Sequence, residues 1–327
     1  MSEAAVRDRH SVQGHRPPAP SGGAYPFRNA AKVFYVNTTG VCSLTCSYCF
    51  TNEAKQRSSL DRSDFDFLFS YYGENIYFVF TGVGDFFAGY KKSDELLRHV
   101  LSHDVQVYLD FNGVLIHELP DLDATQRDRL GRLDISYHYA AMKKRGTLDR
   151  WLENIVRISK RFQPEKYDIK AIVALAEMDL WSEMLLFYKK FAHPFTRAPL
   201  RLVLDQYDPL LRDEQVRAEV TRVLAAVPGP FLLPAGMENN FRIQTNDYYR
   251  GEEASACLAG QRYFKVDCLG RILPCTEIWS RTHCFLGGLK QRRAGYLEEG
   301  PACRQINYAA CLKGWDDRTG WTRKAGA

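Results

Sequence analysis

Features that would place the chain in a membrane or outside the cell are missing from the sequence. No apolar run approaches the ~20 residues that a membrane-spanning helix requires. Residues 1–20 contain no apolar segment of the kind found at the centre of a secretory signal. We therefore expect a cytoplasmic protein with no membrane partner.

The sequence also lacks a large excess of charge of either sign. Its formal net charge is +5 at pH 7, and no block of lysine and arginine stands out. Nucleic-acid binding therefore receives little support, although a mildly basic pocket for an anionic small molecule remains open. Nine cysteines are present. Disulfide bonds are rare in cytoplasmic proteins, so binding of a metal or an iron–sulfur cluster is the better default.

Strand and helix patterns alternate along most of the chain. Residues 1–30 are rich in Pro, Gly, Ser and Arg and predict a disordered N-terminal segment. Beyond them, β-branched and aromatic runs predict strands, at 33–39, 76–82, 105–113, 133–139, 168–177 and 200–206. Helical spacing of apolar residues predicts helices, at 63–73, 93–103 (with Ser93 as N-cap), 147–162, 180–191 and 213–227.

This alternation predicts an α/β protein with a parallel sheet of largely apolar strands. Six units are too few for a complete eight-stranded barrel, so we expect a partial (β/α)6 TIM-like barrel over residues 31–235. After residue 235 the alternation stops and six of the nine cysteines follow. We expect a smaller, cysteine-rich α+β domain over residues 236–327.

Three cysteines lie close together directly after the first predicted strand. Cys42, Cys46 and Cys49 have the spacing C-x3-C-x2-C. Thiolates bind zinc, copper(I) or iron–sulfur clusters. A structural zinc site needs four ligands, whereas a [4Fe–4S] cluster held by three cysteines leaves one iron open to a substrate or cofactor. A zinc site completed by a distant cysteine or histidine stays open as the alternative.

This triplet, with Tyr48 before its last cysteine and Phe50 after it, resembles the signature of the radical S-adenosylmethionine (SAM) enzymes. The resemblance implies that Cys42, Cys46 and Cys49 hold a [4Fe–4S] cluster that binds SAM. It also implies reductive cleavage of SAM to methionine and a 5′-deoxyadenosyl radical, which abstracts a hydrogen atom from the substrate. An oxidoreductase or lyase of this kind needs an electron donor such as flavodoxin or ferredoxin.

The ends of the later strands also resemble segments of that family. Residues 81–87 resemble its Gly-Gly-Glu turn, with Asp85 as the acid, and 110–113 resemble its Thr-Asn-Gly segment. The resemblance implies a set of residues at the cofactor, namely Tyr48, Gly82, Gly84, Asp85, Asn112, Ser136, His138 and Glu177. Alternatives remain open: an ordinary turn for 81–87 and a satisfied core histidine for His138. Asp205 and Gln206 suit either substrate contact or helix capping.

The second group of cysteines surrounds a predicted β-hairpin. Residues 262–267 and 271–275 form its strands around the turn Cys268–Gly270, which would bring Cys257 and Cys275 together at one metal centre. The segment resembles the hairpin of the SPASM and twitch domains of radical SAM enzymes, while the C-x2-C-x5-C run of a full SPASM domain is absent. The resemblance implies one auxiliary [4Fe–4S] cluster, held by Cys257, Cys275, Cys303 and Cys311.

Cys268 and Cys284 are then left over. Each suits either a small buried apolar residue or a catalytic hydrogen-atom donor to a substrate radical. Cys284 could also replace Cys303 as a cluster ligand.

Relatives with this domain plan modify ribosomal peptides, or oxidise, epimerise or decarboxylate small molecules in natural-product biosynthesis. The 41 residues before Cys42 leave no room for a winged-helix peptide reader. We therefore expect a small polar substrate such as a sugar, aminocyclitol or nucleoside. A peptide presented by another protein, a non-catalytic zinc or iron–sulfur scaffold and a cluster carrier remain alternatives.

Overall fold

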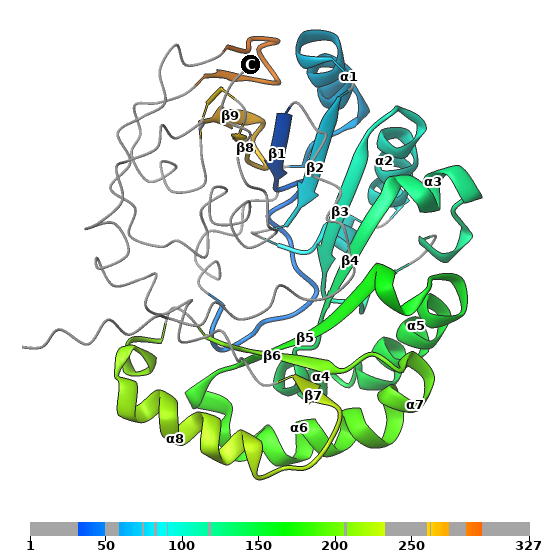
Figure 1. Ribbon diagram of the computed structural model, residues 1–327. Helices are drawn as coiled ribbons and strands as arrows, with labels where there is room; N and C mark the ends of the chain where they lie inside the picture. Colours follow the sequence, from blue (N-terminus) through cyan, green and yellow to red (C-terminus); the bar gives the residue numbers. More distant parts are fainter. Residues whose placement is uncertain are drawn as a thin grey trace, which may run out of the picture.

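The computed structural model describes residues 32–49, 59–73, 75–81, 84–89, 91–116, 119–205, 208–232, 260–261, 263–274 and 286–295. The predicted N-terminal segment 1–30 lies outside the described residues. Within them, a single mixed sheet has the strand order β10-β9-β8-β1-β2-β3-β4-β5-β6-β7 (Figure 1). Its strands are β1 (Lys32–Val36), β2 (Ile76–Phe80), β3 (Gln106–Phe111), β4 (Leu130–Ser136), β5 (Tyr167–Val173), β6 (Leu200–Leu204), β7 (Phe231–Leu232), β8 (Tyr263–Val266), β9 (Arg271–Leu273) and β10 (Gly287–Gly288).

The strands from β1 to β7 are parallel neighbours in chain order. Helices connect them and cover the outer, convex side of the curved sheet (Figure 1). They are α1 (Arg62–Tyr72), α2 (Lys91–Ser102), α3 (Ala124–Arg129), α4 (Tyr139–Arg145), α5 (Leu148–Arg161), α6 (Trp181–Phe187), α7 (His193–Thr196) and α8 (Glu214–Ala225). This arrangement confirms the predicted partial, TIM-like barrel.

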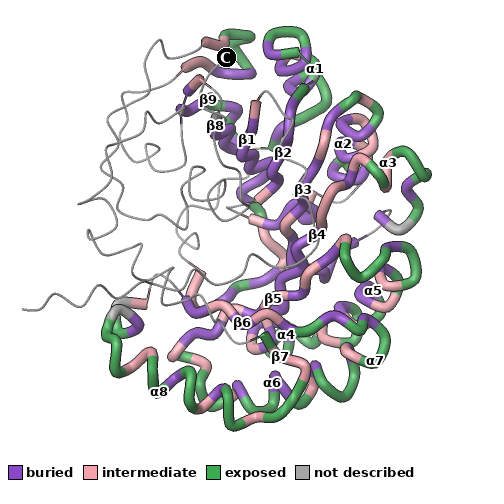
Figure 2. The backbone as a smooth tube through the Cα atoms, viewed as in Figure 1, coloured by how far each residue is buried: buried purple, intermediate pink, exposed green. Residues whose placement is uncertain are grey.

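The hydrophobic core lies between the convex face of the sheet and these helices. In Figure 2 the strands are mostly buried, whereas the outer sides of the helices are exposed. Phe34 of β1 stacks on Phe264 of β8 with ring centroids 4.7 Å apart. Each fully buried side chain of this size contributes about 1.5–3 kcal/mol, so this layer of aromatic and aliphatic residues supplies much of the stability of the sheet.

Strands β2 and β5 differ in how their residues are buried. All five residues of β2 are buried and apolar, as predicted for a strand covered on both faces. In β5, by contrast, buried and half-buried residues alternate. The expectation of largely apolar strands is therefore wrong for β5, because its concave face carries charged side chains.

Two predicted helices differ from the observed ones. Helix α2 begins at Lys91, so Ser93 lies inside the helix and is not its N-cap. Ser93 is buried and packs against Gly89, which has no side chain to displace it. The helix predicted over 180–191 is divided into α6, a π-helical turn (Tyr188–Ala192) and α7. Apolar spacing does not distinguish such a π-turn from a continuous α-helix.

The predicted hairpin near the C-terminus is confirmed in its described part. Strands β8 and β9 are antiparallel, and Gly270 adopts a positive φ of 77° in the turn between them. Strand β8 also pairs in parallel with β1, so the hairpin extends the sheet of the barrel. The division of the chain into domains at residue 235 stays a prediction. Among the helices described, none has the length and apolar character needed to cross a membrane.

Candidate active site

The three clustered cysteines lie on a loop at the C-terminal end of β1. The backbone N–H of Asn37 donates to the Val266 carbonyl at 2.9 Å, which ties the start of this loop to the end of β8. Cys46 is buried, Cys42 and Cys49 are half-buried, and none of the three is in a disulfide bond. The loop turns tightly at its end, where the N–H of Cys49 donates to the Cys46 carbonyl at 3.3 Å.

The environment of Cys46 disfavours a bare thiolate. Burial raises its pKa to about 12; the Tyr48 hydroxyl lowers the pKa, whereas nearby Cys42 and Cys49 raise it further. The three thiols are therefore close enough for their charges to interact. A bound metal centre would reverse this balance, since a coordinating thiol is deprotonated.

Asn112, just after β3, fastens the cysteine loop to the sheet. Its side-chain amide donates to the Ser43 hydroxyl at 2.9 Å and approaches the Cys42 sulfur at 3.8 Å. Its side-chain oxygen accepts from the Val114 N–H at 2.9 Å. The structure thus places Asn112 beside Cys42, and its predicted contact with the cofactor stays a prediction.

The turn after β2 packs against the same loop. Gly84 has a φ of 81°, and a Cβ there would lie 2.5 Å from the Thr39 carbonyl oxygen and 2.6 Å from that of Val41, so only glycine fits. The next residue, Asp85, donates its N–H to the Val41 carbonyl at 2.8 Å. Gly82 lies outside the described residues.

The Asp85 carboxyl group is buried beneath this turn. It accepts the backbone N–H of Asn112 at 2.9 Å. Burial raises its pKa from 3.8 to about 7. Asp85 thus joins the ends of β2 and β3, and its predicted role at the cofactor is not tested by these contacts.

Tyr48 and His138 form a wall on the other side of the loop. The Tyr48 hydroxyl lies 2.6 Å from Nδ1 of His138. Burial, and then the charge of Lys170, lower the pKa of His138 to about 4. His138 is therefore neutral near pH 7, and its Nδ1 can accept the hydroxyl proton. It is a half-buried histidine with a hydrogen-bond partner on the cysteine loop.

Glu177, which follows β5, reaches the loop from the same side. Its carboxylate accepts the Ser47 hydroxyl at 2.6 Å. Burial raises the pKa of Glu177 above its usual value. Loops after four strands therefore converge on the segment between Cys42 and Cys49.

The structure shows a charged network that the sequence did not lead us to predict. On the concave face, Nζ of Lys170 lies 2.7 Å from Asp110 and 2.9 Å from Asp134. Arg201 holds both oxygens of Asp134 at 2.9 Å. Ser136 donates to Asp110 at 3.3 Å, and its predicted role at the cofactor stays a prediction. We call Asp110, Asp134, Lys170 and Arg201 the ion ladder.

Asp134 is the most buried member of the ion ladder. Burial alone would raise its pKa, but Arg201 and Lys170 outweigh that effect and hold the pKa well below its usual value. In the sequence, the ion ladder is indicated by polar and charged residues at every second position of two strands. These are Arg132-x-Asp134-x-Ser136 in β4 and Asp168-x-Lys170 in β5.

The hairpin contributes another buried charge near the loop. Nζ of Lys265 in β8 donates to Oδ1 of Asn37 at 2.5 Å, and burial lowers the pKa of this lysine to about 8. Cys268 is buried just after β8. Because β8 runs parallel to β1, Cys268 lies at the same edge of the sheet as the cysteine loop.

The remaining predicted residues are placed only in part. Asp205 is buried after β6 and donates its N–H to the Val173 carbonyl at 3.0 Å. Several others lie outside the described residues, namely Gln206, Cys257, Cys275, Cys284, Cys303 and Cys311. The predicted auxiliary cluster and the role of Cys284 therefore stay predictions.

Comparisons with known proteins support the fold. No protein-family model and no curated protein matches the chain. The solved structure of Streptococcus suis SuiB bound to S-adenosylmethionine is similar at a TM-score of 0.50 and 14% identity, covering 80% of this chain and 64% of SuiB. SuiB bound to the precursor peptide SuiA gives 0.50 and 14%, covering 86% and 70%.

A third structure, native anSMEcpe with bound AdoMet and the Cp18Cys peptide, gives a TM-score of 0.48 and 15% identity, covering 79% of this chain and 77% of that one. At such identities, the likeness to SuiB shows a shared fold. In the structure bound to S-adenosylmethionine, this chain spans 64% of the length of SuiB.

Proposed function

We propose that the protein is a radical SAM enzyme whose SAM-binding [4Fe–4S] cluster is held by Cys42, Cys46 and Cys49. The observation that carries the proposal is the set of three cysteines with the spacing C-x3-C-x2-C on one loop, at the C-terminal end of the first strand of a partial barrel. Functional residues of such barrels lie at this end of the strands. The shared fold with SuiB, whose solved structure contains bound S-adenosylmethionine, supports the same function.

When bound, the cluster would supply the electron that cleaves SAM to methionine and a 5′-deoxyadenosyl radical. The protein's own residues would hold and shield the reactants. Asn112 and Gly84 fix the loop against β3 and β2, and Tyr48 and neutral His138 form a hydrogen-bonded wall beside it. A fixed, closed site of this kind excludes water and competing hydrogen donors.

We propose a small polar substrate of the sugar, aminocyclitol or nucleoside type, which the enzyme oxidises, epimerises or decarboxylates in natural-product biosynthesis. The ion ladder supports this choice, because it makes the concave face of β3–β6 polar. The second candidate substrate is a ribosomally made peptide. The fold shared with SuiB, which has been solved with its precursor peptide SuiA bound, favours that candidate.

Two further parts of the proposal concern the C-terminal cysteines. We propose one auxiliary [4Fe–4S] cluster, bound by Cys257, Cys275, Cys303 and Cys311, in a twitch-like domain over residues 236–327. Cys268 is proposed as a hydrogen-atom donor, because it lies at the same edge of the sheet as the cysteine loop. An electron donor such as flavodoxin or ferredoxin would reduce the enzyme.

The test is an iron and sulfide count on protein purified and reconstituted without oxygen. We expect about eight irons in the wild type and about four in a Cys42/Cys46/Cys49→Ala variant, with absorption near ~400 nm in both. Only the wild type should form 5′-deoxyadenosine from SAM and dithionite. Cys268→Ala is the matched control and should keep the full iron count.

Each rival predicts a different result. Zinc in place of iron, without the absorption near ~400 nm, would identify a zinc scaffold. A full iron count without any 5′-deoxyadenosine would identify a cluster carrier, and the enzyme assignment would then be wrong.

A further inference from the structure

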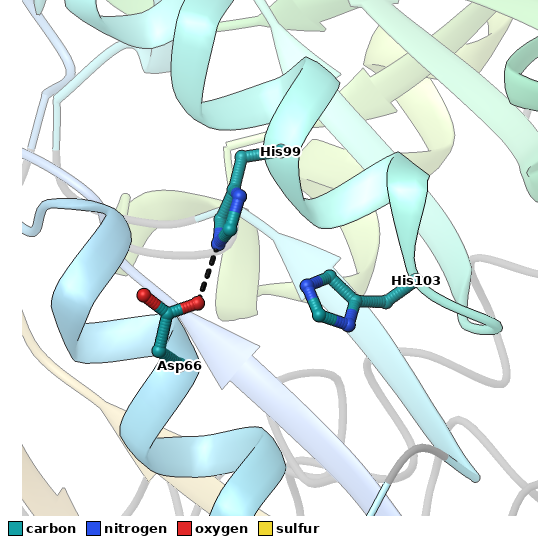
Figure 3. Close-up of side chains that lie close together, drawn as sticks. All are labelled: Asp66, His99 and His103. Carbon is teal, nitrogen blue, oxygen red and sulfur yellow. Dashed lines mark hydrogen bonds and ion pairs between the residues drawn. The ribbon is translucent and has the colours of Figure 1, made fainter.

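A second set of metal-binding side chains lies outside the barrel, between helices α1 and α2. Asp66 of α1 faces His99 of α2 and His103, which follows the end of α2 (Figure 3). Their ligand atoms all lie within 4.8 Å of one another. None of the three takes part in the cysteine loop or the ion ladder, so the proposed function leaves this set unexplained.

The two histidines are held in place by their neighbours. Residues four apart on a helix lie on the same face, and the rings of His99 and His103 are 5.2 Å apart. His103 also stacks on Phe69 of α1 at 4.0 Å. Because the two rings are already restricted, binding of a metal ion would cost less conformational entropy.

The donor set suits a borderline transition-metal ion. Two imidazoles and one carboxylate bind Zn²⁺ in many proteins, with water completing the tetrahedron. Oδ1 of Asp66 lies 2.7 Å from Nε2 of His99, at hydrogen-bond distance. Two ligands of one zinc ion lie about 3.3 Å apart, so Asp66 must move slightly to make room for the ion. The Asp66 side chain is 55% exposed, so it can move by this small amount.

We propose that Asp66, His99 and His103 bind a divalent transition-metal ion, best Zn²⁺, that clamps α1 to α2. A simple ion pair between Asp66 and His99 would explain those two residues alone. It does not include His103, which brings a third ligand atom within 4.8 Å of the other two. The ion would join two consecutive helices of the outer layer and would stabilise the folded chain in proportion to its affinity.

The experiment uses the reconstituted protein, in which iron occupies the cysteines. Zn²⁺ is titrated against a competing chromophoric chelator in the wild type, His103→Gln, Asp66→Asn and the matched control His193→Gln. The wild type and His193→Gln should bind one Zn²⁺ per chain. Loss of either proposed ligand should weaken binding by at least ~10-fold.

Thermal unfolding gives a second measurement. Zn²⁺ should raise the melting temperature of the wild type and of His193→Gln but not that of the other two variants. Since His103→Gln also removes a ring contact with Phe69, Asp66→Asn is the variant that keeps the packing. Equal affinity in all four proteins, or no binding to the wild type, would overturn the proposal.

An independent observation concerns a cavity of about 460 Å³ beside the cysteine loop. Its lining includes Cys42 and Ser43 of the loop together with Arg145 and Arg150. Arg145 also donates to the hydroxyl of Thr45 at 3.2 Å. The cavity is therefore lined both by a proposed cluster ligand, Cys42, and by two arginines.

The segment 143–150 carries four cations and one acid, Asp149. Lys143 is paired with Glu183 at 2.6 Å. Among the residues that the structure describes, Lys144, Arg145 and Arg150 are exposed and form no ion pair. Unpaired charges around one opening attract a partner of opposite sign and speed its approach.

We infer that this face, formed by Lys144, Arg145 and Arg150 around the cavity, docks an acidic one-electron carrier protein. The inference rests on the proposed function, because it assigns the route by which the cluster at Cys42 is reduced. A carrier seated here would approach the cluster from outside the barrel and leave the concave face to SAM and substrate.

A flavodoxin of strongly negative net charge serves as the probe. Its binding to the reconstituted enzyme is measured by calorimetry for the wild type, Lys144→Glu/Arg150→Glu and the matched control Lys92→Glu/Lys160→Glu. The site variant should bind at least ~10-fold more weakly, and wild-type binding should weaken with salt. The control should bind like the wild type.

Comparing two reductants distinguishes this inference from the proposed function. Dithionite is small and needs no docking surface, so it should give the same 5′-deoxyadenosine yield in all three proteins. Reduced flavodoxin should give a lower 5′-deoxyadenosine yield with the site variant than with the other two. Failure of every protein with dithionite would contradict the enzyme assignment, and the binding measurement would still test the surface. Equal flavodoxin binding by the site variant and the control would overturn the docking inference.

Discussion

The buried carboxyl group of Asp85 predicts an unusual dependence of stability on pH. Burial raises its pKa from 3.8 to about 7, so the folded protein holds a proton there that the unfolded chain has lost. The free energy of unfolding should therefore fall as pH rises from 3.8 to about 7 and should level off above that. Asp85→Asn removes the titrating group and should remove this part of the slope.

The magnitude follows from the same interval. Each pH unit is worth about 1.4 kcal/mol, so the difference between 3.8 and about 7 corresponds to at most about 4 kcal/mol. Asparagine keeps an oxygen that can accept the N–H of Asn112, which now bonds Oδ1 of Asp85 at 2.9 Å. We therefore expect the variant to be more stable than the wild type at pH 8, and the difference to vanish near pH 4.

Urea unfolding under anaerobic conditions at several pH values measures this difference. Asp104→Asn is the control, because it removes a carboxyl group whose side chain is 87% exposed, and it should follow the wild type at every pH. If Asp85→Asn shows the same slope as the wild type between pH 4 and 8, the buried carboxyl is not the source of the dependence and the reasoning fails.

Three further substitutions test how the site is held. Gly84→Ala places a methyl group 2.5 Å from a backbone oxygen of the cysteine loop; we expect a loss of about 1–3 kcal/mol in unfolding free energy and less iron bound after reconstitution. Lys170→Met leaves two carboxylates of the ion ladder short of a cation, and urea unfolding should show a loss near the lower end of ~3–5 kcal/mol, since Arg201 remains. Tyr48→Phe leaves Nδ1 of the half-buried His138 without its 2.6 Å partner and should cost about 0.5–1.5 kcal/mol in the same assay.

Matched variants keep these predictions falsifiable. Gly146 also has a positive φ, but a Cβ there meets nothing within 4 Å, so Gly146→Ala should keep the iron that Gly84→Ala loses. Lys189 is exposed and bonds only a carbonyl oxygen among the contacts described, so Lys189→Met should change stability by less than about 0.5 kcal/mol. Adding Asp110→Asn to Lys170→Met should restore part of the loss. Equal effects of Lys170→Met and Lys189→Met would contradict a structural ion ladder.

The alternation of strands and helices could be predicted because each strand forms a distinct β-branched or aromatic run. The partner of β1 on its other edge could not be predicted so simply. Pairing of β8 with β1 joins segments at opposite ends of the chain, and no local pattern encodes a contact at that separation. The same limit applies to the π-helical turn after α6, where packing decides between two helical forms with similar sequence preferences.

The cysteine loop was visible in the sequence because its chemistry is local, with three thiols in one short segment. The ion ladder was not, because its members come from four different strands and meet only when the sheet curves. Ser136 illustrates the difference. The family resemblance predicts a role for it at the cofactor, whereas its hydrogen bond to Asp110 at 3.3 Å becomes visible only in the folded protein.

The parallel pairing of β8 with β1 has a consequence for how the chain can be made and cut. Strand β1 is synthesised early, but its second edge stays unpaired until β8 leaves the ribosome, which takes tens of seconds at roughly 5–20 residues per second. During that time its exposed N–H and C=O groups can pair with another chain. A protein truncated at residue 235 would keep this edge open permanently and would also lose the Phe264 ring that covers Phe34. Such a truncated barrel should aggregate, whereas the full chain closes its own edge.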